Sequence, residues 1–358
     1  MAERTFFIAE AGVNHNGSLD LALQLVDVAA AAGADAVKFQ TFKASKLVTA
    51  GAAKADYQVA NMKEGGTQLG MLQRLELSEQ DHHALLAHCK QVGIQFMSTA
   101  FDAESLAFLA QLGMPALKLP SGDITCAPLL LQAARLRMPL IVSTGMATLA
   151  DIEDALGVIA FGLTSQAEPA GRADFLAAYC SAAGRQALAK HVSLLHCVTQ
   201  YPAPAEAVNL RAMDSMAAAF GLPVGYSDHT LGIEISLAAV ARGATIIEKH
   251  FTLDRALPGP DHAASLEPDE LRQLVAGIRN IEKALGSTIK APVAAESGNR
   301  PVARRSLVAA RPITKGELIT AEALVPKRPG SGISPMEFWD LLGRPAVRDF
   351  DTDELIER

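Results

Sequence analysis

Short apolar runs alternate with helix-like segments through the first 286 residues. The run FFIAEA (6–11) precedes a helical periodicity from Leu19 to Ala32, with Ser18 as its expected cap, and DAVKFQ (35–40) follows. Six further runs are rich in β-branched or large apolar residues: IQFMST (94–99), PALKLPS (115–121), PLIVSTG (139–145), VSLLHC (192–197), LPVGYSD (222–228) and ATIIEKH (244–250). Because each run precedes a segment that can form a helix, the pattern predicts eight strand and helix units.

Eight such units predict a (β/α)₈ TIM barrel, a fold that typically needs ~250 residues. A doubly wound open sheet is the competing architecture. We favour the barrel because polar residues stand at the C-terminal end of nearly every predicted strand, and a barrel brings those ends together on one face.

The chain is expected to divide into a barrel domain (1–286), a linker (287–301) and a small β-rich domain (302–358). Two connections within the barrel are long. The connection 43–77 follows the second strand and can act as a lid over the site. The connection 161–190 precedes the sixth strand, so we expect a peripheral helical elaboration on the face opposite the site.

Composition excludes several classes of protein. The net charge of −7 and the 5% aromatic content leave no basic surface typical of nucleic-acid binding. The first apolar run is too short to span a membrane and lacks a signal-peptide layout, so we expect a cytoplasmic protein. The four cysteines form no C-x-x-C pair, which predicts small buried apolar residues rather than disulfides or a zinc site.

The polar strand-end residues include two lysines and several hydroxyl side chains, which suit a phosphate or carboxylate ligand. A lysine that forms a Schiff base is the alternative. The strand-end set comprises Glu10, Lys38, Gln40, Ser98, Thr99, Phe101, Lys118, Ser121, Ser143, Thr144, His196, Tyr201, Ser227, Asp228, His229, Glu248 and His250.

His229 and His250 end adjacent predicted strands, which favours a two-histidine metal site with positions left for water and substrate. Two ordinary hydrogen-bonded histidines are the alternative. Asp228 and Glu248 stand close to these histidines, but strand alternation is expected to direct them elsewhere, with Asp228 in a supporting role.

Nine phrases occur in an order that resembles the sialic acid synthase family: IAEAGVNHNGS, DAVKFQTFKASKL, FMSTAFD, LKLPSGD, IVSTGMAT, LLHCVTQYP, VGYSDHT, IIEKHFTLD and PGPDH. The segment around VPKRPGSGIS resembles that family's C-terminal antifreeze-like (SAF) module. The resemblance implies a synthase that condenses phosphoenolpyruvate with an N-acetylated amino sugar, N-acetylmannosamine first, to give N-acetylneuraminate and phosphate. It also implies a divalent metal, with Mn²⁺ expected before Mg²⁺ or Co²⁺, held by His229 and His250.

The resemblance assigns further roles residue by residue. Glu10 would exchange a proton with the sugar, Asp123 would activate water in place of the family's usual glutamate, and Arg328 would reach the active site of the partner in a domain-swapped homodimer. Thr199 stands where the family has an asparagine. Phosphoenolpyruvate would be bound by Lys38, Thr99, Lys118, Ser121, Ser143 and Ser227, and the sugar by Gln40, Asn61, Phe101, Tyr201, Asp261 and Arg328.

Three alternatives stay open. A legionaminic or pseudaminic acid synthase would use the same chemistry on a 6-deoxy diacetamido sugar. A metal-dependent aldolase would cleave its substrate rather than join two substrates, and it would need no phosphoenolpyruvate. A non-enzymatic scaffold would tolerate replacement of His229 and His250.

Overall fold

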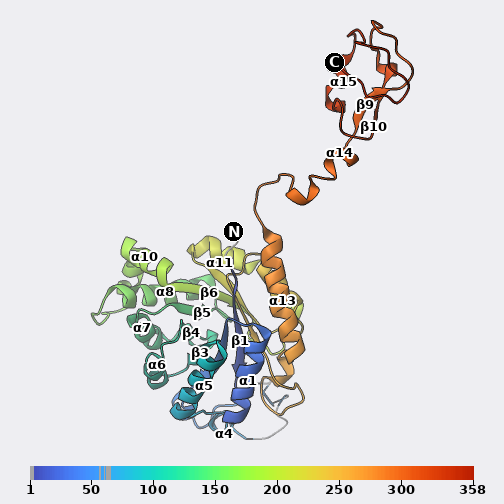
Figure 1. Cartoon of the computed structure of the whole chain (residues 1–358). Coiled ribbons are helices and arrows are strands. Elements are labelled where there is room, and N and C mark those ends of the chain that lie inside the picture. The colour runs from blue at the N-terminus through green and yellow to red at the C-terminus, as the bar shows by residue number, and fades with distance from the viewer. Residues whose placement is uncertain (1–3, 56–57, 60, 62–65) are drawn as a thin grey trace. The chain divides into compact units, whose positions relative to one another are not determined.

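The computed structural model describes residues 4–55, 58, 59, 61 and 66–358 of the chain. Two compact units are present, residues 1–286 and residues 287–358. Figure 1 shows the order of their elements along the chain. Each unit has its own hydrophobic core, and each is considered by itself.

Unit 1 is a closed barrel of eight parallel strands. Consecutive strands pair with each other, and the ring closes where β1 pairs with β8. The TIM-barrel prediction is therefore confirmed, and each predicted run coincides with one strand, although β1, β2 and β3 extend one residue beyond their runs. The strands are β1 (Phe6–Gly12), β2 (Ala36–Thr41), β3 (Gln95–Ala100), β4 (Leu117–Leu119), β5 (Leu140–Ser143), β6 (Val192–Cys197), β7 (Val224–Asp228) and β8 (Ile246–His250).

A helix follows each strand and covers the outside of the barrel (Figure 1). Several of these helices begin at a side-chain cap: Ser18 accepts a hydrogen bond from the Leu21 amide, and Ser78 and Thr148 each form a capping box. The eight helices are α1 (Leu19–Ala32), α5 (Glu79–Val92), α6 (Ala103–Leu109), α7 (Ala127–Arg135), α8 (Leu149–Thr164), α11 (Ala212–Phe220), α12 (Glu234–Ala241) and α13 (Pro268–Leu285).

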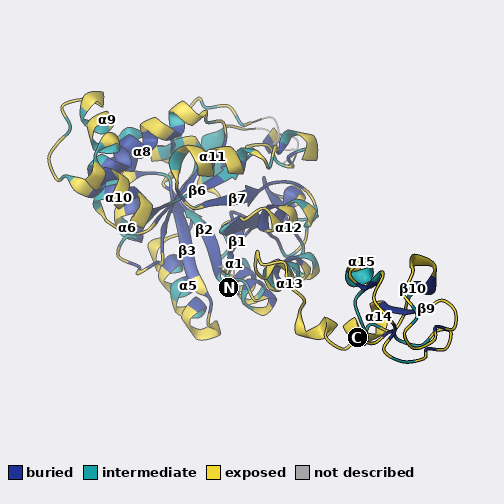
Figure 2. Ribbon diagram, turned by 90° about the horizontal axis from the view of Figure 1, so that it is seen from above, coloured by how far each residue is buried: buried dark blue, intermediate teal, exposed yellow. Residues whose placement is uncertain are grey.

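Strand alternation divides the barrel residues between two cores. Figure 2 shows the residues of the barrel strands largely buried and many residues of the surrounding helices exposed. Outward side chains such as Phe7, Val37 and Phe96 pack against the helices in the larger core. Inward side chains near the strand starts form a separate apolar layer: Ile8, Ala36, Met97, Ala116, Ile141, Leu195 and Ile246. Gly225 belongs to the same level, where a Cβ atom would lie 2.3 Å from the Ile246 carbonyl oxygen.

The connection after β2 contributes two short helices, α2 (Ala44–Leu47) and α4 (Gln68–Gln73). The connection before β6 contributes α9 (Arg172–Cys180) and α10 (Ala182–His191), so its predicted helical character is confirmed. The first of these two helices, α9, contacts the barrel helix α8. This helix packs along α8, because apolar residues on both helices are buried by the contact. The ring of Phe175 lies edge-on to that of Phe161, with the ring centroids 5.6 Å apart.

Unit 2 is a small module with one two-stranded antiparallel sheet, β9 (Ser306–Ala309) and β10 (Leu324–Lys327). Its core includes Leu307, Ile313, Phe350 and Ile356. The remaining elements are the helices α14 (Arg300–Ala303) and α15 (Phe338–Leu341) and the 3₁₀ turns η4 (Ala294–Glu296), η5 (Ala321–Ala323) and η6 (Pro335–Glu337).

All four cysteines are free thiols. Cys89 and Cys197 are buried, as predicted, and Cys126 is half-buried. Cys180 is exposed, contrary to expectation, because it ends α9, a helix with no fully buried residue.

Candidate active site at the C-terminal ends of the strands

A polar layer lies directly above the apolar layer of the barrel interior. Its members stand two positions further along their strands than the apolar ones, so the same inward face changes from apolar to polar within one pleat repeat. This layer, which we call the floor, consists of Glu10, Lys38, Thr99, Lys118, Ser143, Cys197, Ser227 and Glu248. The floor closes the inner end of a cavity of about 480 Å³.

Two lysines and two carboxylates balance each other in the floor. The Lys38 ammonium lies 2.7 Å from Glu10 Oε2 and 3.5 Å from Glu248 Oε2, and it donates a hydrogen bond of 2.8 Å to Thr99. The Lys118 ammonium lies 3.6 Å from Glu248 Oε1. All four charged side chains are at least 94% buried. The lysines are therefore held in place by the carboxylates rather than unpaired at a rim.

Burial and the neighbouring charges separate the pKa values of the two carboxylates. Burial raises the pKa of Glu10 to about 7, with only partial opposition from Lys38. Burial also acts on Glu248, but Lys118 and Lys38 outweigh it and lower the pKa to about 2. Glu10 can thus hold or release a proton near neutral pH, whereas Glu248 stays ionised.

The pKa values of the two lysines, Lys38 and Lys118, also shift in opposite directions. Burial lowers the pKa of Lys118, and Glu248 offsets this only in part. Burial also opposes the charge on Lys38, but Glu10 and Glu248 outweigh burial and raise its pKa. Lys38 is therefore the more firmly charged of the two.

The hydroxyl side chains expected to bind phosphoenolpyruvate line the cavity together. Ser227 donates a hydrogen bond of 2.8 Å to Glu248 Oε1, and Ser121 accepts one of 2.9 Å from the Gly145 amide and lies 3.0 Å from the Cys197 sulfur. The buried Ser143 hydroxyl has no hydrogen-bond partner among the described residues. An unsatisfied buried hydroxyl that lines a cavity is suited to receive a ligand atom.

His229 and His250 meet at the cavity, with ring centroids 5.6 Å apart. The His229 Nδ1 atom lies 2.6 Å from the Val198 carbonyl oxygen, so Nδ1 holds the proton and Nε2 keeps a lone pair. The His250 Nδ1 atom is buried without a partner among the described residues. Burial lowers the pKa of His229 to about 4 and that of His250 well below its usual value. Both rings are therefore neutral, as metal ligation requires.

Most residues expected to bind the sugar surround the same cavity. The Tyr201 ring stacks on His229 with a centroid distance of 4.1 Å, and Gln40 donates a hydrogen bond of 3.4 Å to Glu10. Phe101 also lines the cavity, as does the buried Asp261, whose pKa burial raises to about 6.

Two expected sugar contacts are placed differently. Asn61 does not line the cavity itself, and its amide donates a hydrogen bond of 2.6 Å to the Pro260 carbonyl beside Asp261. Arg328 belongs to unit 2, where its Nε donates to the Ala303 carbonyl at 3.0 Å. Its contact with a partner subunit stays a prediction.

Asp123 and Thr199, the two departures from the family pattern, both line the cavity. Asp123 lies in the 3₁₀ turn η1 (Ser121–Asp123). Its buried Oδ2 atom has no partner among the described residues, and burial raises its pKa to about 6. A Cβ atom on Gly145 would lie 2.3 Å from the Thr199 hydroxyl oxygen, so a glycine at position 145 is needed for this packing.

Glu248 was not assigned a role from the sequence, yet it is central to the floor. The expectation that alternation directs it elsewhere is wrong, because it stands two positions before His250 and so shares its inward face. Counting by two from the histidine would have found it. Asp228 does face outward, and it pairs with Lys249 behind the two histidine strands at 2.9 Å.

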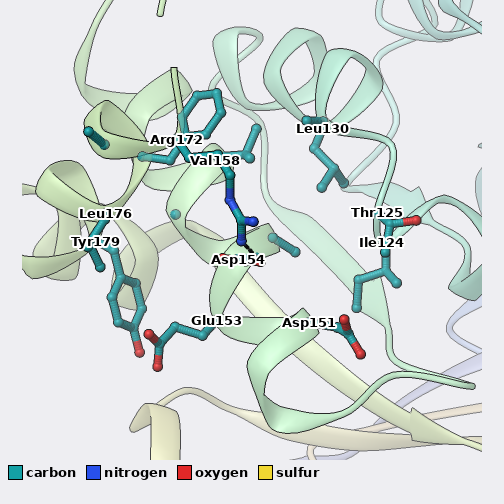
Figure 3. A pocket seen from close by; sticks show the side chains of 15 residues that line it. Ile124, Thr125, Leu130, Asp151, Glu153, Asp154, Val158, Arg172, Leu176 and Tyr179 are labelled. Atoms are coloured by element: carbon teal, nitrogen blue, oxygen red, sulfur yellow. Dashed lines mark hydrogen bonds and ion pairs between the residues drawn. The ribbon is translucent and has the colours of Figure 1, made fainter. Parts of the chain in front are cut away.

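A second cavity, of about 500 Å³, lies between α7, α8 and α9 (Figure 3). Apolar side chains such as Leu130 and Val158 line it, and Arg172 points to Asp154 across its edge. None of the expected site residues lines this cavity. Among the described residues, most of the expected site residues line the barrel cavity and none lines this second one.

Comparison with known proteins identifies the family of the chain. Residues 25–290 match the NeuB family and residues 304–357 match the SAF domain. The chain is 47% identical to the N,N'-diacetyllegionaminic acid synthase of Campylobacter jejuni, over 99% of both chains. It is 31% identical to the human N-acetylneuraminate-9-phosphate synthase, over 98% of this chain and 91% of the human one.

Among solved structures, the N-acetylneuraminic acid synthetase of Leptospira borgpetersenii is 34% identical with a TM-score of 0.67, and the match covers 83% of this chain and 90% of that one. Within the described part of this chain, no helix is both long and apolar enough to cross a membrane. The chain therefore belongs to the NeuB family, carries a C-terminal SAF domain and is an enzyme of the nonulosonic acid synthase class.

Proposed function

We propose that this enzyme condenses phosphoenolpyruvate with a 6-deoxy diacetamido sugar and water to give an N,N'-diacetyllegionaminic acid and phosphate. The observation that carries the reaction class is the buried floor of two lysines and two carboxylates, surrounded by hydroxyl side chains. The choice of sugar rests on the 47% identity to two legionaminic acid synthases, against 31% to the human N-acetylneuraminate-9-phosphate synthase. The order of preference expected from the sequence, with N-acetylmannosamine first, is therefore reversed.

In this proposal Lys38 and Lys118 bind the phosphate and carboxylate of phosphoenolpyruvate, and the hydroxyls of Thr99, Ser121 and Ser143 orient it. Carbon 3 of phosphoenolpyruvate attacks the sugar aldehyde, which leaves an oxocarbenium-like centre at carbon 2. Water adds there, and phosphate then leaves with cleavage of the carbon–oxygen bond.

Two carboxyl groups suit the proton transfers of this reaction. Glu10, with a pKa of about 7, can donate a proton to the aldehyde oxygen as it becomes an alkoxide. Asp123, with a pKa of about 6 and an unpartnered buried oxygen, can accept a proton from the attacking water. The two groups therefore divide the acid and base roles.

His229 and His250 would hold a divalent metal, Mn²⁺ first. Their neutral rings and the free lone pair of His229 fit this role. No group of three or more potential metal ligands occurs among the described residues, so water and substrate oxygens would complete the coordination. Such a metal would supply Lewis-acid polarisation of the sugar carbonyl.

We further propose a domain-swapped homodimer in which Arg328 enters the active site of the partner. The arginine is exposed, and its guanidinium makes one hydrogen bond through Nε, which leaves donors for a substrate carbonyl. Mixing an Arg328→Ala subunit with a Lys118→Met subunit tests this. Activity should return in the mixture, because one site of each mixed dimer then has both side chains, and no recovery would refute the swap.

Phosphate release against a panel of amino sugars tests the reaction. The 6-deoxy diacetamido sugar should support turnover that depends on both substrates, is lost in EDTA and returns with Mn²⁺. Good turnover of N-acetylmannosamine with none of the diacetamido sugar would overturn the choice of sugar. Turnover without phosphoenolpyruvate would indicate an aldolase instead.

A further inference from the structure

Beyond the charged floor, a cluster of apolar side chains lines the barrel cavity, together with the amide side chains of Gln58 and Gln68. The residues that form this apolar cluster, which we call the apolar wall, are Val13, Phe42, Leu47, Val48, Met71, Leu72 and Leu75. Four of them form a buried cluster of their own, against which Leu47 and Leu72 pack. Leu47, Val48 and Leu72 are only half-buried, so they still present apolar surface within the cavity.

The wall is a built structure. Leu47 lies in α2, and Met71 and Leu72 lie in α4. Glu76, just after α4, accepts a hydrogen bond of 2.7 Å from the Ala44 amide at the start of α2. On the other side, Gly17 approaches so closely that a Cβ atom there would lie 2.3 Å from the Arg74 carbonyl oxygen. These two contacts fix the wall between the β1 and β2 connections.

The position of the wall determines which part of a sugar can reach it. In the proposed function phosphoenolpyruvate lies on the lysines of the floor, so the sugar aldehyde that it attacks lies next to the floor. Leu47, Val48 and Leu72 follow β2 and stand beyond the strand ends. The end of the sugar chain away from the aldehyde therefore faces the wall.

From this arrangement we infer that the apolar wall selects sugars that lack the terminal hydroxyl, and that Leu47 and Leu72 are specificity-determining residues. The inference rests on the proposed function for the orientation of the sugar. A 6-deoxy sugar places a methyl group on the wall, which favours burial. N-acetylmannosamine would place a hydroxyl there, and the wall side chains offer it no hydrogen-bond partner.

A pair of substrates that differ in one oxygen atom isolates this effect: N-acetylmannosamine and its 6-deoxy analogue. For the wild type we expect the ratio of kcat/KM values to favour the 6-deoxy sugar by about 10- to 100-fold, the range typical of apolar pockets. Leu72→Gln introduces an amide that can bind the hydroxyl, and the ratio should fall about tenfold, through the sugar KM. Leu72→Met keeps the wall apolar and should keep the ratio.

The KM for phosphoenolpyruvate reports on an intact floor, and Leu149→Gln, an exposed leucine outside the cavity, controls for the substitution itself. An unchanged ratio in Leu72→Gln, or a wild type that favours N-acetylmannosamine over its 6-deoxy analogue, would overturn the inference. A wild type that discriminates this pair but rejects the diacetamido sugar would refute the proposed substrate and leave the wall supported. If the wild type uses the diacetamido sugar but Leu72→Gln keeps the ratio, the proposed substrate is supported and the inference about the wall is refuted.

Discussion

The ion pair between Asp228 and Lys249 lies behind the two histidines, with both side chains fully buried. Lys249 contacts Asp228 Oδ2 at 2.9 Å and donates to the Thr230 carbonyl at 2.6 Å. Asp228 accepts four more hydrogen bonds, two from Thr230 at 2.8 Å, one from Ser236 at 2.6 Å and one from Tyr226 at 3.3 Å. Because Asp228 precedes His229 and Lys249 precedes His250, this pair supports both histidine positions from outside the barrel.

The unequal hydrogen bonding of the two partners predicts unequal losses of stability. Breaking a buried pair costs about 3–5 kcal/mol. Lys249→Met leaves Asp228 with its four neutral donors, so we expect a loss near the low end, about 3 kcal/mol. Asp228→Asn removes the only charge that compensates the buried Lys249 ammonium in this pair, so we expect a loss near the high end.

The loss in Asp228→Asn should also depend on pH. Burial lowers the pKa of Lys249. Without Asp228, the lysine can avoid the free-energy cost of a buried unpaired charge by losing its proton. Deprotonation of a lysine with an unfolded pKa of about 10.4 costs about 5 kcal/mol at pH 7 and about 2 kcal/mol at pH 9. A base with a lowered pKa binds fewer protons when folded, so stability rises with pH up to the unfolded pKa. The defect of Asp228→Asn should therefore shrink at pH 9, whereas that of Lys249→Met should not.

Thermal unfolding at pH 7 and pH 9 measures both effects. A loss of 3 kcal/mol lowers Tm by roughly 6–12 °C in a domain near this size. The double variant Asp228→Asn/Lys249→Met removes both charges and should be no less stable than Asp228→Asn at pH 7. Additive losses in the double variant, or a defect of Asp228→Asn that does not change with pH, would refute this reasoning.

Three further predictions concern the floor, the histidines and the barrel core. Phosphoenolpyruvate should bind with proton uptake at pH 8, because its negative charge raises the pKa of Glu10 above about 7. Calorimetry in buffers of different ionisation enthalpy measures this proton uptake. The Glu10→Gln variant should abolish the uptake. His229→Asn should abolish Mn²⁺ binding measured by electron paramagnetic resonance, whereas the surface variant His88→Asn should not, and retained binding in His229→Asn would contradict the two-histidine site. Gly225→Ala should destabilise the barrel by about 1–3 kcal/mol in thermal unfolding, because its Cβ would lie 2.3 Å from a backbone oxygen; unchanged stability would contradict the packing.

The apolar pattern was sufficient to predict the barrel and its strands because each buried strand is a continuous apolar run closed by polar residues. The same pattern located Lys38, Lys118 and the two histidines, since all stand within or just after the predicted strand runs. It did not predict that α9 packs against α8, because a helix with exposed residues on much of its surface does not indicate which neighbour it contacts. The expectation was also wrong for Glu248, because a residue two positions before His250 in a strand shares its inward face.

The sequence by itself determined the eight strand and helix units, the small C-terminal module and the residue types at each strand end. Local periodicity suffices for these features because it reflects which face of each element is buried. Only the tertiary structure decided that Glu10 and Glu248 neutralise the two lysines, and that their pKa values move in opposite directions. Those outcomes depend on distances between strands far apart in the sequence, and on how completely closure of the barrel excludes water from the charges.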